Sequence, residues 1–417
     1  MFKRIPGTKD ILPQEVSGWQ EIEGLSRAVF SLYHYQEIRP PLIEFASLFD
    51  RSLGAFAEIV QKQMFLIKNQ EDTYALRPEG TAAIVRAYIE NSLDKTAGFL
   101  KLYYMGPMFR LERPQKGRLR QFHHIGCEAI GSHDPGVDVE VIALAAQLLK
   151  AFGIDGYRIK LNSLGCDKDK KELARLLQEK LQDKVDGLCE ECRERFGHNI
   201  LRILDCKKDP CRKIVSDLKL GSTYLCDSCA ADFDAVTSGL SALNIPYEIV
   251  PHLVRGLDYY TRTVFEITHD ALGAQDAIGA GGRYDNLVAE LGGPEAGAIG
   301  FALGVERVLL ARGSRDRQER RDLVYLIPLG AEAKKKSMVL LYGLRTAGIG
   351  ADTDYEGKSL KGAMRSAHEA GARFAVIIGE DELKKGTAAV KDMVTSGQEE
   401  IAFDNLITIV HDKLAGN

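Results

Sequence analysis

Apolar positions in the first part of the chain change their spacing, and each change predicts a different element. Over residues 16–33 they recur at helical spacing, whereas residues 37–43 contain two consecutive prolines, which favour an extended backbone. Residues 101–109 are aromatic and strand-like, residues 122–130 are a second strand candidate, and the basic segment between them is broken by proline and glycine. The pattern predicts a helix, an extended segment and then two antiparallel strands joined by a loop.

The composition of the sequence changes in the middle of the chain. From Gly165 to about Leu240 the sequence is charge-dense, helix-prone and rich in cysteine, and strand patterns resume at residues 247–251 and 262–268. We therefore expect an inserted, mainly helical subdomain within a larger domain. The expected bounds are 166–240 for the insertion, with 1–165 and 241–311 for the domain that it interrupts.

Glycine-rich segments mark the end of this larger domain. Residues 279–284 and 292–300 hold glycine at a density typical of backbone that approaches a ligand. Residues 301–310 predict a helix that starts from them. Residues 312–321 are charged and lack apolar periodicity, so they predict a linker.

Beyond the linker, strand and helix patterns alternate within residues 322–417. The predicted strands are 323–328, 348–354 and 372–378, and the predicted helices are 331–347 and 359–370. Such alternation predicts a small α/β domain with parallel strands and right-handed crossovers.

Composition narrows the class of protein. The 417 residues are 45% hydrophobic and 27% charged, which is typical of folded globular proteins and excludes bulk disorder, collagen-like repeats and a coiled-coil rod. The net charge of -4 argues weakly against a nucleic-acid partner, although an average hides local basic patches. No apolar segment has the length of a signal peptide or a membrane span, so we expect a cytoplasmic protein without membrane contact.

Common nucleotide motifs do not fit this chain. Gly357–Ser359 lacks the earlier glycine of a phosphate loop, because Asp352 stands at that position, and no GxGxxG follows a convincing strand. Arginines spread over several segments remain, and arginine is suited to phosphate and carboxylate. The candidates are Arg110, Arg113, Arg118, Arg120, Arg255, Arg283 and Arg307. Solvated surface arginines are the alternative, but Arg307 lies in an apolar segment where a charge needs a partner.

Three segments of the chain, two of which contain candidate arginines, resemble the motifs of class II aminoacyl-tRNA synthetases. Phe109–Glu112 together with Arg118–His123 resembles motif 2, Gly300–Arg307 resembles motif 3, and the helix leading to Pro41 resembles motif 1. The resemblance implies an antiparallel sheet flanked by helices.

Further segments resemble one family within this class. Arg255–Thr261 and Gly281–Asp285 are similar to the two histidine-specific signatures of histidyl-tRNA synthetases, and Leu76–Thr81 matches the same family. The motifs occur in the family's order and span nearly the whole chain. The implied fold is α+β, with the class II antiparallel sheet, an inserted mainly helical subdomain and a C-terminal α/β domain of the anticodon-binding type.

The resemblance implies a histidine–tRNA ligase that works in two steps. ATP and L-histidine form histidyl-adenylate and pyrophosphate, and the histidyl group then passes to the 3′-terminal ribose of tRNA(His). No covalent enzyme intermediate is implied, because attack of a carboxylate on the α-phosphorus needs positioning and charge stabilisation. The implied ligands and partners are ATP, Mg²⁺, L-histidine, tRNA(His) and a second copy of the chain in a homodimer.

The resemblance also implies roles for individual residues. The catalytic residues are Arg110, Arg255 and Arg307. The histidine-binding residues are Glu79, Gly80, Thr81, Arg110, His124, Glu128, Arg255, Tyr259, Tyr260 and Tyr284. The ATP-binding residues are Arg110, Glu112, Arg118, Phe122 and Arg307. Imidazole offers one donor and one acceptor, so a carboxylate at one nitrogen and a tyrosine hydroxyl near the other suit it.

Two features leave alternatives open. The family usually has glutamine where this chain has His124, and we expect the histidine to be a tolerated substitute. Histidyl-synthetase-like proteins also include catalytically silent regulatory paralogues. Because such paralogues tend to lose the histidine signatures or the C-terminal domain, both of which are present here, the sequence favours the enzyme.

Cysteines cluster within the expected insertion, where six of the eight lie between Cys189 and Cys229. The two CxxC pairs can supply four thiolates to a structural zinc, through Cys189, Cys192, Cys226 and Cys229. Their separation is longer than in typical zinc ribbons, and six candidates exceed four places. Both observations favour the alternative of buried or adventitious thiols over a zinc site.

Overall fold

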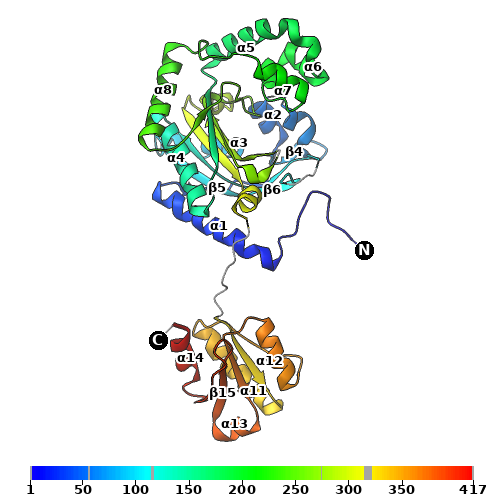
Figure 1. Cartoon of the computed structure of the whole chain (residues 1–417), viewed down its shortest axis with the longest axis vertical. Helices are drawn as coiled ribbons and strands as arrows, with labels where there is room; N and C mark the ends of the chain where they lie inside the picture. Colours follow the sequence, from blue (N-terminus) through cyan, green and yellow to red (C-terminus); the bar gives the residue numbers. More distant parts are fainter. Residues whose placement is uncertain (1, 55–56, 114–116, 274, 314–321, 416–417) are drawn as a thin grey trace. The chain divides into compact units, whose positions relative to one another are not determined.

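The computed structural model describes residues 2–54, 57–113, 117–273, 275–313 and 322–415 and divides into two compact units, Met1–Ser314 and Arg315–Asn417 (Figure 1). Most of the predicted linker, from residue 314 to 321, lies outside the described residues, as do residues 114–116 of the predicted hairpin loop. None of the described helices is long and apolar enough to cross a bilayer.

The first unit is built on an eight-stranded sheet with the order β1-β5-β6-β11-β10-β9-β7-β8. Neighbours from β5 to β7 run antiparallel, and the short edge strands β1 and β8 pair in parallel. The predicted hairpin is confirmed, because β5 and β6 pair from Leu100 with Ile130 to Phe109 with Gln121. The strands are Gln36–Glu37 (β1), Leu100–Phe109 (β5), Gln121–Ile130 (β6), Arg158–Ser163 (β7), Glu248–Ile249 (β8), Thr261–Thr268 (β9), Ala277–Arg283 (β10) and Ala298–Gly304 (β11).

Helices close one face of this sheet. They are α1 (Pro13–Leu32), α4 (Pro135–Phe152), α8 (Asp227–Ala242) and α10 (Val305–Arg312). Side chains alternate between the two faces of β6, so Ile125 and Cys127 point toward the helices and pack in one core with Leu144 of α4. Helix α4 begins where the Asp134 side chain accepts a hydrogen bond from the Gly136 amide at 2.7 Å. The opposite side chains of β6 are left facing away from these helices.

The part of the chain between β1 and β5 forms a second, small sheet of three strands. Its order is β2-β4-β3, and helix α3 follows β4 directly. The elements here are β2 (Ile43–Phe45), α2 (Ala46–Leu53), η1 (Ile59–Gln63), β3 (Phe65–Lys68), β4 (Thr73–Leu76), α3 (Thr81–Glu90) and η2 (Leu93–Lys95). The sharp turn from β4 into α3 places Glu79 and Thr81 next to the main sheet.

Between β7 and β8 the chain is helical, as predicted for this stretch. The helices are α5 (Asp167–Leu181), η3 (Gln182–Gly187), α6 (Glu190–His198), η4 (Ile200–Ile203), α7 (Asp209–Ser216) and α8. Leu173, Leu177 and Leu181 form the buried side of α5 and share a core with Leu253 and Val254. Each buried leucine contributes about 2 kcal/mol, so this segment anchors the loop that carries Arg255.

The prediction of a helix over residues 301–310 is wrong at its start. Residues 298–304 form strand β11, and α10 begins only at Val305. Strand β11 is buried or half-buried along its whole length, with Ile299, Phe301 and Leu303 in the helix-covered core and small residues on the cavity face. A continuous apolar segment of this kind resembles a buried helix in sequence. Helix η5 (Asp270–Leu272) and helix α9 (Leu287–Glu290) complete the first unit.

The second unit holds a five-stranded sheet with the order β13-β12-β14-β15-β16. The predicted parallel strands are confirmed for β13, β12 and β14, whereas β15 and β16 are antiparallel and were not predicted. The strands are β12 (Val324–Pro328), β13 (Ala351–Thr353), β14 (Phe374–Ile378), β15 (Thr387–Asp392) and β16 (Gln398–Ala402). The helices are α11 (Ala331–Thr346), α12 (Leu360–Glu369), α13 (Glu380–Lys385) and α14 (Leu406–Ala415).

Candidate active site

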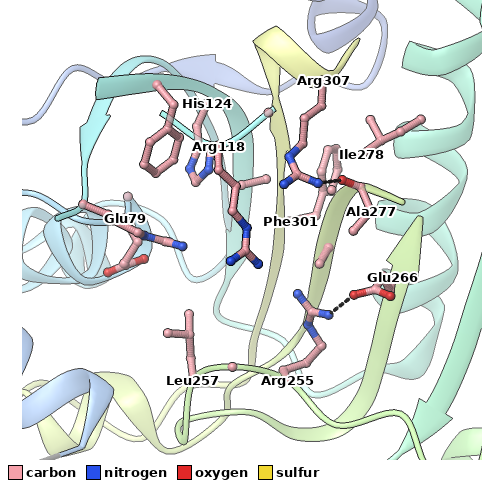
Figure 2. A pocket seen from close by; sticks show the side chains of 18 of the residues that line it. Glu79, Arg118, His124, Arg255, Leu257, Glu266, Ala277, Ile278, Phe301 and Arg307 are labelled. Carbon is pink, nitrogen blue, oxygen red and sulfur yellow. Dashed lines mark hydrogen bonds and ion pairs between the residues drawn. The ribbon is translucent and has the colours of Figure 1, made fainter. Parts of the chain in front are cut away.

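A cavity of about 360 Å³ opens on the face of the main sheet away from α1 and α4 (Figure 2). Phe122 and His124 of β6 line it, because they alternate with Ile125 and Cys127, which point into the helical layer. Strands β5, β9, β10 and β11, the start of α3 and the loop around Arg255 supply the other walls. The structure brings nearly all of the sequence-predicted site residues to this cavity.

Glu128 forms a buried polar centre beside the cavity. Its Oε1 accepts a hydrogen bond from Thr81 Oγ1 at 2.7 Å, and its Oε2 accepts one from Tyr284 Oη at 2.5 Å. Burial raises the pKa of Glu128 to about 8, although both hydroxyl hydrogen bonds act in the opposite direction. A Cβ on Gly300, which faces Glu128 across β6 and β11, would lie 1.8 Å from Oε2, so only glycine leaves room for this carboxyl.

Glu79 holds the start of α3 in place. Its carboxylate accepts hydrogen bonds from the backbone amides of Thr81 at 2.6 Å and Ala82 at 2.8 Å. Burial raises the pKa of Glu79, while these amides and Arg110 partly offset the effect. Glu79 therefore caps the helix and orients Thr81 toward Glu128.

Three tyrosines surround this polar centre. The rings of Tyr259 and Tyr260 lie 4.7 Å apart between centroids, and those of Tyr259 and Tyr284 lie 5.7 Å apart. Burial raises the pKa of all three, that of Tyr260 to about 12, so their hydroxyls stay protonated at neutral pH. This end of the cavity thus presents tyrosine hydroxyls together with two buried carboxyl groups, those of Glu79 and Glu128.

Arg110 and Arg118 come from the predicted hairpin. The Nε of Arg110 donates to the Pro78 carbonyl at 2.9 Å, and its guanidinium lies over the Phe122 ring at 5.2 Å from the centroid. Arg118 pairs with the Glu112 carboxylate at 3.2 Å and donates to Gln275 Oε1 at 2.9 Å. A flat aromatic ring, a guanidinium and a carboxylate therefore stand together at the mouth of the hairpin.

Arg307 and Arg255 reach the cavity from other segments (Figure 2). Arg307 donates to the backbone carbonyls of Gly117 at 3.2 Å, Gln275 at 3.0 Å and Ala277 at 2.5 Å, which supply the partners that its apolar helix lacks. Arg255 donates to Glu266 Oε2 at 2.7 Å. Its buried Nε has no hydrogen-bond partner among the described residues. Both guanidinium groups keep donors available for an anion in the cavity.

His124 lies between the two ends of the cavity. Its ring is 5.1 Å from that of Phe122, edge to face, and its buried Nδ1 has no hydrogen-bond partner within the described part of the chain. Burial and the nearby positive charge of Arg110 lower the pKa of His124 to about 3. The imidazole is therefore neutral at physiological pH.

Not every candidate arginine lies at the cavity. Arg283 is 1% exposed and donates to both oxygens of Asp138, to Asp285 and to the Ser132 carbonyl. It holds β10 to the start of α4 and has a structural role. Arg120 donates to the carbonyls of Glu112 and Pro6, and Arg113 is exposed outside the cavity.

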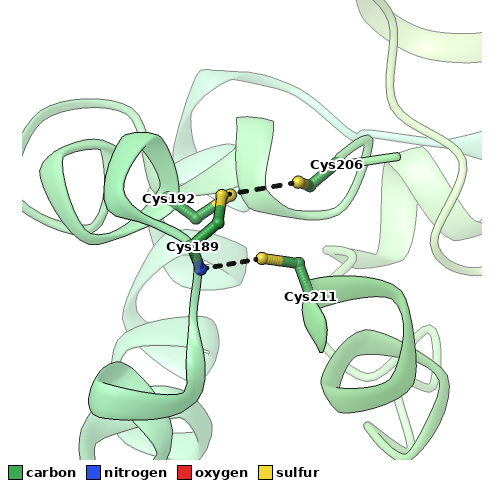
Figure 3. Close-up of side chains that lie close together, drawn as sticks. All are labelled: Cys189, Cys192, Cys206 and Cys211. Carbon is green, nitrogen blue, oxygen red and sulfur yellow. Dashed lines mark hydrogen bonds between the residues drawn. The ribbon is translucent and has the colours of Figure 1, made fainter. Parts of the chain in front are cut away.

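The structure does not assemble the predicted zinc ligands. Cys189 and Cys192 lie with Cys206 and Cys211 (Figure 3), whereas Cys226 and Cys229 lie with Cys166 and Asp169. The two CxxC pairs lie at the starts of different helices, α6 and α8, and each pair meets residues that are distant in sequence. The predicted set is therefore corrected to two separate groups.

Sequence reasoning missed several residues that line the cavity: Tyr104, Asp205, Lys207, Glu266 and Gln275. Tyr104 packs against Gly80 and Gly126, where a Cβ would come within 2.4 Å and 2.5 Å of its ring. Alternation along β5 and β9 could have identified Tyr104 and Glu266. Nothing in the sequence indicates that residues 205–207 of the helical segment return to the cavity.

Comparison with known proteins decides the family. Residues 7–308 match the family model described as Histidyl-tRNA synthetase, and residues 323–413 match the one described as Anticodon binding domain. The chain belongs to the histidyl-tRNA synthetase family. This confirms the resemblance that the motifs had indicated and the α+β class II fold.

Relatives of this family match over the full length. The histidine–tRNA ligase of Natranaerobius thermophilus is 45% identical over 96% of this chain and 97% of its own. That of Geobacter metallireducens is 45% identical over 97% of this chain and 98% of its own. The crystal structure of apo S. aureus histidyl-tRNA synthetase superposes with a TM-score of 0.82 at 35% identity, covering 98% of this chain and all of that one.

Proposed function

We propose that the chain is a histidine–tRNA ligase that activates L-histidine with ATP and transfers it to tRNA(His). One observation carries the proposal. A single cavity is lined at one end by hydroxyl groups that hold the buried carboxyl of Glu128 behind them, and at the other by four arginines, Arg110, Arg118, Arg255 and Arg307. The first end suits an imidazole, and the second suits a carboxylate facing a triphosphate.

The carboxyl end is proposed to bind the amino acid. Glu128 would accept a hydrogen bond from one imidazole nitrogen, with Tyr260 and Tyr284 near the ring. Glu79 and Thr81 would bind the substrate amino group. A substrate without a matching donor and acceptor would leave these buried groups unpaired, which is the physical basis of selectivity here.

The arginine end is proposed to bind ATP. Phe122 would stack on adenine with Glu112 at its edge, Arg118 and Arg307 would hold the β- and γ-phosphates, and Arg110 would bridge the histidine carboxylate and the α-phosphate. Fixed positive charges placed before reaction stabilise the charge that develops at the α-phosphorus.

Arg255 is proposed to act on the α-phosphate. Its Nη1 is held by Glu266, so the guanidinium enters the cavity in a fixed orientation and keeps further donors for the phosphate. Mg²⁺ prefers oxygen ligands and binds with one or two carboxylates plus substrate phosphates. The carboxylates of Glu112 and Glu266 in the cavity fit that donor set, and the ion would neutralise phosphate charge when bound.

The decisive experiment is ATP–pyrophosphate exchange with and without L-histidine. We expect strong stimulation by histidine when ATP and Mg²⁺ are saturating. Histidine that binds without stimulating exchange would favour the regulatory alternative. Failure of other amino acids to stimulate exchange would test the imidazole assignment.

The remaining proposed partners concern other surfaces. The second unit matches an anticodon binding domain, which supports binding of the tRNA anticodon there. The small sheet exposes apolar side chains on β2 and β3, with Ile43 at 49% and Phe45 at 54% exposure, next to the motif-1 segment. These support a homodimer, and a mass near twice 46.1 kDa by light scattering would test it.

A further inference from the structure

Four cysteine sulfurs converge in the helical segment between β7 and β8 (Figure 3). Cys189 precedes α6 and Cys192 lies in its first turn, Cys206 follows η4, and Cys211 lies in the first turn of α7. All four Sγ atoms lie within 4.8 Å of one another, and those of Cys189 and Cys206 are 3.9 Å apart. Tetrahedral zinc with Zn–S bonds of about 2.3 Å places its sulfurs about 3.8 Å apart.

The four sulfurs form a closed and mostly buried group. Cys192, Cys206 and Cys211 are buried. The backbone amide of Cys189 donates to Cys211 Sγ at 3.2 Å, so one sulfur already accepts a hydrogen bond from a neighbouring segment. Four thiolates in a closed, buried group are a donor set that selects zinc.

The second cysteine group is built differently. Its fourth member is a carboxylate, and both oxygens of Asp169 accept backbone amides, one from Cys166 at 3.2 Å and one from Cys226 at 3.1 Å. These hydrogen bonds join the start of α5 to the start of α8 without a metal. The group with four sulfurs is therefore the better metal site.

We propose that Cys189, Cys192, Cys206 and Cys211 bind one structural Zn²⁺. The ion joins two ends of a segment that reaches the active-site cavity, since Asp205 and Lys207, on either side of Cys206, line that cavity. Arg202, just before this point, donates to the Gly256 carbonyl at 2.6 Å in the loop that carries Arg255. The zinc thereby fixes the segment that supports this loop.

Metal content of the full chain tests the proposal. The chain is purified under reducing conditions without added metal, and zinc is measured by mass spectrometry together with the number of reactive thiols. We expect one zinc per chain, and under about 0.1 per chain in Cys206→Ser and Cys211→Ser. The matched control Cys226→Ser removes a sulfur from the other group and keeps one zinc.

Three results would overturn the proposal: unmodified protein without zinc, zinc retained in Cys206→Ser and Cys211→Ser, or zinc lost in Cys226→Ser. None of these results depends on histidine-stimulated exchange, so the metal site and the proposed activity fail separately.

A second measurement uses the unmodified chain and so does not depend on whether a variant folds. Co²⁺ replaces zinc after removal of the metal by a chelator. We expect intense thiolate-to-cobalt charge-transfer bands with the ligand-field bands of a tetrahedral site of four sulfurs, and their loss on addition of Zn²⁺. A weak spectrum typical of octahedral oxygen ligands would contradict the assignment.

Discussion

The two ends of the candidate active-site cavity differ in how far their charged groups are already hydrogen-bonded within the protein. At the carboxyl end, both oxygens of Glu128 already accept hydroxyl hydrogen bonds, and burial favours the protonated form. At the arginine end, Arg255 and Arg110 are held by one or two protein groups each and retain donors. Glu128 therefore has its hydrogen bonds satisfied within the protein, whereas the arginines keep donors for the negative charge of the substrates in the proposed assignment.

This difference predicts where each substitution is felt. In the proposed assignment, a change at the arginine end removes charge that would act on the reacting phosphate, so it should lower the rate of adenylate formation. A change at the carboxyl end removes selectivity for the ring, so it should raise the KM for histidine and leave ATP binding intact.

Arg255→Ala is expected to have the largest effect. Loss of a fixed positive charge at the α-phosphate should lower histidine-dependent exchange on the order of 1000-fold, while histidine binding stays measurable by calorimetry. Because Glu266 would lose its partner, Arg255→Lys provides a variant that keeps the charge.

Arg175→Ala is the matched control for this substitution. Arg175 is exposed on α5 and pairs only with Glu172 and Glu179 of the same helix among the described residues. Its exchange rate should stay near that of the unmodified chain. Near-normal exchange in Arg255→Ala would remove Arg255 from the catalytic assignment.

Glu128→Gln is expected to come next. The variant keeps the shape of the side chain but replaces a carboxyl, which can release its proton when an imidazole N–H binds, by an amide that cannot ionise, which should raise the KM for histidine about 100-fold. The KM for ATP should change little, because Glu128 lies at the other end of the cavity. An equal rise in both constants would show that the two ends do not act separately.

Glu128 also predicts a dependence of stability on pH. Its pKa of about 8 in the folded chain lies above the value of 4.5 for an unperturbed carboxyl. Between these values the folded state binds a proton that the unfolded state releases, so the free energy of unfolding falls as pH rises. From pH 6 to pH 8 the loss from this group is about 2 kcal/mol.

Urea unfolding followed through the single tryptophan, Trp19 in α1, measures this effect for the first unit. In Glu128→Gln the titrating group is absent, so the variant should lose about 2 kcal/mol less than the unmodified chain over the same interval. Parallel slopes for the two proteins would contradict the raised pKa.

What the sequence could predict depended on whether the interactions involved are local or join residues that are distant in the chain. The β5–β6 hairpin was predictable because its alternation and its turn are local. Arg110 and Arg118 lie in the loop that joins the two strands of this hairpin, so their place at the site followed once the hairpin was recognised. The start of β11 was not predictable, because small apolar residues on its cavity face and large ones on its core face leave no alternation of polar and apolar positions to mark a strand.

Tertiary contacts decided the remaining cases. Arg283 and Arg255 lie in similar signature segments, yet only the structure shows that Asp138 and Asp285 saturate Arg283 whereas Glu266 leaves donors on Arg255. The cysteine pairs likewise have the spacing of zinc ligands, but the folding of α6, α7 and α8 decides which sulfurs meet. Spacing alone indicates a residue's chemistry and not its partner.

His124 gives the smallest expected effect, and it tests the boundary between the two ends. With a pKa near 3 the imidazole is neutral, so it offers one donor and one acceptor, as the amide of glutamine does. His124→Gln should therefore retain exchange activity within about tenfold, or ~1.4 kcal/mol, and its pH profile between 6 and 9 should match that of the unmodified chain. A larger loss, or a shifted profile, would show that His124 takes part in reading the substrate ring.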